Sequence, residues 1–225
     1  MPAPIQRLAE IAEGQWGLLT RAQGERTGVA RATFARLIER GQLERVAHGV
    51  YRIRGAGEVD HLQLRAAWLQ LAPDRPAWDR PDQADVAVVS HTSAASLYGV
   101  GDLRPDIHVF TSLRRWQTRR TDVRIHRGWV ADNDRILLKG LPTTRAARMI
   151  ADLLGEHIEP TAVARITLQV LENIYDYPRV VAEKIRPYAA VFGFNPGDGV
   201  GLLAHLLELA GGGLDRETML EMARS

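Results

Sequence analysis

Apolar residues at three- and four-residue spacing predict two short helices near the start of the chain. Thr20 and Gln23 have the spacing of a capping box, so the first helix should begin at Arg21. Gly28 can adopt the left-handed conformation that ends a helix. The second helix is expected over residues 30–40, and two helices joined by such a turn form a helix-turn-helix. Its apolar face should contain Phe34, Leu37 and Ile38.

The opposite face of this second helix is polar and basic. Thr33, Arg36 and Arg40 form an outward row along it when the apolar face points inward. Arg31 lies at its start. The second helix of a helix-turn-helix enters the major groove of DNA, where an arginine can bond O6 and N7 of guanine together. The sequence therefore predicts a DNA-reading surface here.

A tight hairpin is expected directly after this helix. Residues 43–46 and 50–54 have the pattern of strands, and the segment 47–49 forms the turn between them. This hairpin is the wing of a winged helix-turn-helix, and its basic side chains are expected to hold phosphates. These side chains are Arg45, Arg52 and Arg54.

Other patterns set the limits of this module. Residues 4–12 should form its first helix, and the segment 55–57, Gly-Ala-Gly, is a flexible boundary. A helix over 58–71 and a surface loop over 72–85, which is rich in proline and aspartate, are expected next. We therefore expect a winged helix-turn-helix DNA-binding domain at residues 1–57.

The second domain, residues 58–225, should have a mixed α/β part at 58–155 and a helical part at 156–225. The fold class is accordingly α+β. Strands are predicted at 86–89, 107–110, 123–126 and 135–138, a helix at 91–98 capped by Ser90, and another from a cap at Thr143 to Leu154. Helices of the tail should start near Pro160, Pro178, Pro196 and Asp215.

Composition and charge narrow the function. The 225 residues include no cysteine, which excludes disulfides and thiolate metal sites, and no apolar run approaches the length of a membrane span, so a cytoplasmic protein is expected. Residues 21–54 carry eight arginines against three glutamates, which suits phosphate neutralisation. The alternatives are arginines that are simply solvated, or a winged helix that contacts protein.

Catalytic patterns are weak, and we expect no enzyme, no cofactor and no metal site. Ser90, in the run Ser-His-Thr-Ser, is explained as a helix cap. The glycines at 197, 199 and 201 follow no strand and more simply begin a helix. The seven histidines show no pair at ligand spacing, and neither Lys139 nor Lys184 has the acidic residue two positions before it that a nuclease motif needs.

A second basic segment follows in the middle of the chain. It contains several arginines and one tryptophan, a composition that could bind nucleic acid or an acidic protein. The alternative is a solvated hairpin with no binding role. This possible second basic surface consists of Arg114, Arg115, Trp116, Arg119, Arg120, Arg124 and Arg127.

Several motifs together resemble the AbiEi-type antitoxins of bacterial type IV toxin-antitoxin systems. The matching runs are Gly-Leu-Leu-Thr-Arg at 17–21, Gly-Val-Ala-Arg-Ala-Thr at 28–33 and Gly-Gln-Leu-Glu-Arg-Val-Ala-His-Gly-Val-Tyr at 41–51. Further matches are Val-Ser-His-Thr-Ser-Ala-Ala at 89–95 and Gly-Leu-Pro-Thr-Thr at 140–144. The resemblance covers about residues 15–155 well and the tail loosely.

The resemblance implies a repressor that binds repeats in its own promoter and an antitoxin that counteracts a nucleotidyltransferase toxin of the same operon. The implied DNA-binding residues are Arg31, Thr33, Arg36 and Arg40 on the helix, with Arg45, His48 and Arg52 on the wing. Members often have serine where this chain has Ala30, so a hydroxyl helix cap is missing. A stand-alone regulator whose second domain binds a ligand or dimerises is the alternative.

Overall fold

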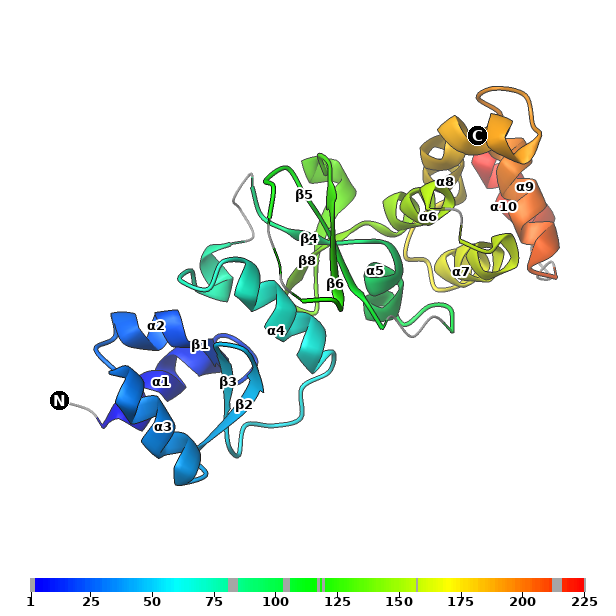
Figure 1. The fold of residues 1–225 in the computed structure, drawn as a ribbon. Coiled ribbons are helices and arrows are strands. Elements are labelled where there is room, and N and C mark those ends of the chain that lie inside the picture. The colour runs from blue at the N-terminus through cyan, green and yellow to red at the C-terminus, as the bar shows by residue number, and fades with distance from the viewer. Residues whose placement is uncertain are drawn as a thin grey trace. The chain divides into compact units, whose positions relative to one another are not determined.

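The computed structural model describes residues 3–80, 85–102, 106–116, 118, 120–156, 158–211 and 216–224. The chain forms two compact units (Figure 1). The N-terminal unit comprises residues 1–87 with 114–117, and the second unit comprises 88–113 with 118–225. Each is described by itself. The predicted functional boundary after residue 57 stays a prediction.

The N-terminal unit contains the predicted winged helix-turn-helix. Three helices and a three-stranded antiparallel sheet in the order β1-β3-β2 make up this module. The strand β1 was not predicted, because its three residues are all buried and show no alternation. The elements are α1 (Pro4–Glu13), β1 (Leu18–Thr20), α2 (Arg21–Arg26), α3 (Arg31–Glu39), β2 (Leu43–Ala47) and β3 (Val50–Ile53).

Local sequence signals explain the helix-turn-helix. Thr20 Oγ1 accepts a hydrogen bond from Gln23 N at 3.1 Å, and Gln23 Oε1 accepts one from Thr20 N at 2.9 Å, so the capping box is confirmed. Gly28 has φ of +78°, as the turn requires. Ala30 precedes α3 in an extended conformation and makes no side-chain cap.

The core of this module lies between α1, α3 and the sheet. Phe34 and Leu37 are buried there, as predicted, against Leu8, Leu19 and Leu43. Ile38 was also predicted to point inward, and this prediction is wrong: 36% of it is exposed. One position beyond Leu37, it has turned with the helix toward the solvent side.

The helix α4 (Leu62–Leu71) packs on the winged sheet within the same unit. It begins four residues later than the predicted start at residue 58, because His61 has φ of +54° and does not continue a helix. Its Trp68 is buried and donates a hydrogen bond from Nε1 to Ala87 O at 2.8 Å.

The segment after α4 is partly buried, although a surface loop was predicted. It contains the short 3₁₀ helix η1 (Ala77–Asp79). Gln15 Oε1 accepts a hydrogen bond from Ala77 N at 2.8 Å, and Gln23 Nε2 donates one to Arg75 O at 2.9 Å. Arg80 is buried and donates to several backbone carbonyl groups. Hydrogen bonds of polar side chains thus hold this segment, which has few apolar residues, against the rest of the unit.

The second unit contains a mixed five-stranded sheet in the order β6-β5-β4-β8-β7. The pairs β5–β6 and β4–β8 are parallel, and the other two pairs are antiparallel. The elements are β4 (Val88–Val89), α5 (His91–Tyr98), β5 (His108–Ser112), β6 (Val123–Arg127), η2 (Asp132–Asp134), β7 (Arg135–Leu138), β8 (Leu141–Thr144) and α6 (Ala146–Gly155).

Of the two helix caps predicted in this unit, the one at Thr143 is wrong, and the one at Ser90 has the right position but no side-chain hydrogen bond to the helix. Thr143 lies in β8, where its Oγ1 donates to Leu141 O at 2.9 Å, and the residue that precedes α6 is Arg145. Ser90 precedes α5 as predicted, but its side chain makes no cap hydrogen bond. Its Oγ instead accepts a hydrogen bond from Thr111 Oγ1 at 2.9 Å, because α5 packs on β5.

The last described part of the chain is helical, as predicted; the first two of these α-helices pack beside α6, and the later α-helices pack on those two (Figure 1). The predicted cap Asp215 lies outside the described residues. Nowhere in the described ranges is a helix both long enough and apolar enough to cross a membrane. The elements are α7 (Pro160–Glu172), α8 (Pro178–Ile185), the 3₁₀ helix η3 (Arg186–Phe192), α9 (Gly199–Leu209) and α10 (Arg216–Arg224).

Candidate nucleic-acid interface

A groove of about 300 Å³ lies between α3 and the wing. Its walls carry basic side chains from three elements and from the wing turn, above an apolar floor. The basic lining residues are Arg21, Arg31, Arg45 and His48, and the others are Phe34, Ala35, Ile38, Gly49 and Tyr51.

The predicted residues of α3 lie on its solvent side. Arg31, Arg36 and Arg40 are exposed, and Thr33 is half-buried. Arg36 Nη2 donates a hydrogen bond to Thr33 Oγ1 at 3.2 Å, which holds the guanidinium along the helix. A guanidinium in this position presents its other N–H groups outward, as a base or phosphate contact requires.

The wing carries a second pair of basic side chains, Arg45 on β2 and His48 in the turn. Arg45 and His48 are exposed, with Arg45 Nη2 3.2 Å from His48 Nδ1. Gly49 has φ of +71°, which this tight turn requires. Gln70 Nε2 of α4 donates to His48 O at 2.8 Å and supports the turn from behind. The wing is therefore held in place beside α3.

Arg52 and Arg54 differ, although both were predicted to hold phosphates. Arg54 is exposed at the end of the wing. Arg52 is partly buried, and its Nη2 donates to Ala56 O at 2.8 Å and also to Gly57 O. Its guanidinium therefore ties the wing to the segment that follows, and its phosphate contact stays a prediction.

Sequence reasoning missed Arg21 and Ile38 as parts of the groove. Arg21 N donates to Gly49 O at 2.8 Å, so the start of α2 lies against the wing turn. This proximity follows from the pairing of β1 with β3, and β1 was not predicted. No local signal in the sequence marks it.

The predicted second basic surface divides between the two units. Arg114, Arg115 and Trp116 belong to the N-terminal unit, where Arg114 lies over the Trp116 ring at 4.4 Å. The second unit contains Arg120, which pairs with Asp122, Arg124, which lies 3.7 Å from Glu156, and the exposed Arg127. Arg119 lies outside the described residues. A single surface formed by all seven stays a prediction.

The second unit shows where the glycines at 197–201 and the histidines of the sequence analysis lie. Asp198 Oδ1 accepts a hydrogen bond from Gly201 N at 2.7 Å at the start of α9, so these glycines begin a helix as predicted. Histidine spacing gave no ligand pair, yet His91, His126 and Glu156 meet in space, with one ligand-type atom of each within 4.8 Å of the others.

Comparison with known proteins bears on the winged module. Residues 6–54 match the model of a family described as "Transcriptional regulator, AbiEi antitoxin". No curated protein matches the chain. The resemblance inferred from the motifs is thus confirmed over the winged helix-turn-helix, the part of the chain that holds the basic groove. Over residues 6–54, the chain is thus similar to the AbiEi antitoxin family of transcriptional regulators.

Proposed function

We propose that this protein represses its own operon by binding repeats in the promoter, and counteracts a nucleotidyltransferase toxin encoded beside it. The observation that carries the DNA-binding half is the groove between α3 and the wing, with four basic side chains on its walls. Such a protein acts in the bacterial cytoplasm. The toxin-directed half rests on the family match of residues 6–54.

The geometry suggests a division of labour on DNA. Arg31 and Arg36, in the first turns of α3, are proposed to meet base edges in the major groove, as the N-terminal residues of recognition helices do. Arg40 directly follows α3, and Arg45 and His48 lie on the wing; we propose that these three hold phosphates. Arg21 joins this second group because it lines the same groove.

The test of DNA binding is a fluorescence anisotropy titration of the full chain. One labelled duplex carries the DNA upstream of the protein's own gene, and the control is a scrambled duplex of equal length and composition. We expect tighter binding to the upstream duplex by about 10³-fold or more, and weaker binding to both at higher salt. Equal affinity for the two duplexes would rule out a specific repressor.

The test of toxin neutralisation is co-expression with the adjacent nucleotidyltransferase gene. We propose that the protein acts by binding rather than by catalysis, and that residues 58–225 carry this activity. Growth should be rescued by the full chain. Absence of such a gene, or failure of rescue with normal operator binding, would favour the alternative, a stand-alone regulator whose second domain binds a ligand or dimerises.

A further inference from the structure

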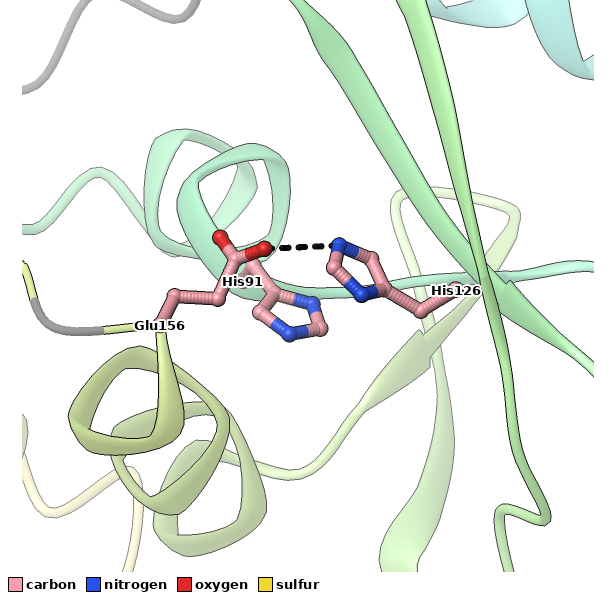
Figure 2. A group of neighbouring side chains, drawn as sticks. All are labelled: His91, His126 and Glu156. Carbon is pink, nitrogen blue, oxygen red and sulfur yellow. Dashed lines mark ion pairs between the residues drawn. The ribbon is translucent and has the colours of Figure 1, made fainter.

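Three side chains with metal-binding atoms converge in the second unit (Figure 2). His91 is the first residue of α5, His126 lies on β6, and Glu156 directly follows α6. His126 Nε2 is 2.8 Å from Glu156 Oε1, and the imidazole rings of His91 and His126 stack with centroids 4.2 Å apart. Elements distant in the sequence thus bring two imidazoles and a carboxylate together.

The contact between His126 and Glu156 is close but not satisfied as a hydrogen bond. His126 Nε2 is buried, and among the described residues it has no hydrogen-bond partner of acceptable geometry, despite the 2.8 Å separation. A buried polar atom left in this way is costly to the fold. A cation placed between the nitrogen and the carboxylate oxygen would satisfy both.

The third side chain is held in place by its surroundings. His91 is buried and has φ of +52°, a conformation that costs free energy for a residue with a side chain. Its Nδ1 lies 2.9 Å from Ser90 Oγ, which in turn accepts a hydrogen bond from Thr111 Oγ1 at 2.9 Å. Hydroxyl groups behind a histidine fix its ring as the outer shell of a metal site does.

We propose that His91, His126 and Glu156 bind one divalent first-row transition-metal ion, represented by Zn²⁺, with water at the fourth position. Two histidines and a carboxylate are a donor set that zinc takes in proteins. At zinc-ligand bonds of about 2.1 Å, tetrahedral ligands lie roughly 3.4 Å apart. The 2.8 Å pair would open slightly, and the stacked rings would rotate so that their nitrogens converge.

Arg124 provides an internal check on this arrangement. Its Nη1 lies 3.7 Å from Glu156 Oε1, so its guanidinium competes with a metal ion for the carboxylate. Arg124→Ala should therefore strengthen metal binding several-fold if Glu156 is a ligand. Unchanged or weaker binding in this variant would contradict that assignment.

The main experiment is a Co²⁺ titration of the tag-free full chain after treatment with EDTA. We expect one equivalent of Co²⁺ to give visible absorption of a four-coordinate ion, displaced by Zn²⁺, and Zn²⁺ alone to raise the thermal midpoint. His126→Asn and Glu156→Gln should weaken binding at least tenfold. His108→Asn is the matched control, because it removes an imidazole of β5 that faces Asp122 instead.

Two outcomes would overturn the proposal. One is the absence of stoichiometric Co²⁺ or Zn²⁺ binding in the folded wild-type chain, which needs no variant to fold. The other is binding that survives both substitutions. The site belongs to the second unit and the DNA groove to the N-terminal unit, so failure here leaves the proposed DNA binding untouched.

Discussion

Arg36 and Arg52 both belong to the basic N-terminal module, but their surroundings differ. Arg36 is exposed on α3 and is held by Thr33. Arg36→Ala should cost about 1–3 kcal/mol of operator affinity if the guanidinium meets a base, with less effect on non-specific DNA. Anisotropy with the upstream and scrambled duplexes measures both. Arg165→Ala, which removes an exposed arginine from α7 of the second unit, is the charge-matched control and should leave both affinities unchanged.

Arg52 should behave as a structural residue. Because its guanidinium donates to carbonyl groups beyond the wing, Arg52→Ala should lower the free energy of unfolding by about 1 kcal/mol, as expected for a partly exposed charged hydrogen bond. Arg54→Ala removes an exposed arginine two residues farther along, and should leave the free energy of unfolding unchanged. Urea denaturation of the two variants decides the matter. A uniform loss of DNA affinity in Arg52→Ala with unchanged stability would instead support the predicted phosphate contact.

Asp122 makes a contribution to stability that depends on pH. The side-chain hydrogen bond from Arg120 holds the pKa of Asp122 at about 2, below its ordinary value of 3.8. A carboxyl group with a lower pKa in the folded chain stabilises the fold above the unfolded pKa, and this stabilisation is lost as pH falls from about 4 toward 2. Asp122→Asn should therefore destabilise the protein at pH 6, by less than about 1 kcal/mol because this pair is partly exposed. The difference from wild type should shrink at pH 2.5, and a constant difference would contradict the assignment.

Among the elements, those with a helical period or an explicit cap could be predicted from the sequence. The capping box of Thr20 and the glycine at 28 define α2 and its end by chemistry that is local to the chain. The strands β1 and β8 could not be predicted, because each is short and wholly buried and so shows no alternation. The arrangement of the groove follows from β1, and Arg21 was missed for that reason.

The helix α3 lacks a side-chain cap, which offers a direct test of its stability. Ala30 already has the extended conformation of an N-cap residue, with φ of −65° and ψ of 150°. Ala30→Ser would supply a hydroxyl acceptor to the N–H groups of the first turn, where only a backbone carbonyl now accepts from Thr33 N, and should stabilise the fold by about 1 kcal/mol. The denaturation midpoint measures this gain. No gain would mean that water already satisfies these groups.

The contact of α2 with α3 depends on a glycine. A Cβ atom added at Gly24 would lie 2.5 Å from Phe34 Cζ and 2.8 Å from Leu8 Cδ2. Gly24→Ala should therefore destabilise the fold by about 1–3 kcal/mol through overpacking. Gly57→Ala, where a Cβ atom meets nothing within 4 Å, is the matched control. Equal stability of the two variants in thermal unfolding would show that α2 can shift without cost.

For the whole molecule, the net charge of +2 says little about DNA, because the basic residues gather in segments. If about five basic side chains of the groove and its rim each neutralise one phosphate, affinity should fall roughly 10²–10³-fold between 50 and 200 mM salt. Anisotropy titrations across this range measure the slope. If DNA affinity hardly depends on salt concentration, the basic module contacts protein instead, which is the alternative named in the sequence analysis.

The meeting of His91, His126 and Glu156 is likewise a property of the whole fold. These residues are far apart in the sequence, so no ligand spacing marks them. The packing of α5 on β5, the parallel pairing of β5 with β6 and the end of α6 bring them together. Such a site could not be predicted from the sequence pattern, which records neighbours along the chain.

Residues 72–80 are hydrogen-bonded to Gln15 and Gln23, and this limits where the winged module can be joined to another protein. The family match ends at residue 54, but the two buried amides that brace α2 bond backbone groups of Arg75 and Ala77. A chimera joined at residue 54 would leave these amides without their acceptor and donor. Gene fusions that keep the winged module and exchange the rest of the chain should therefore be joined after Arg80, so the unit that can be transferred is longer than the family match.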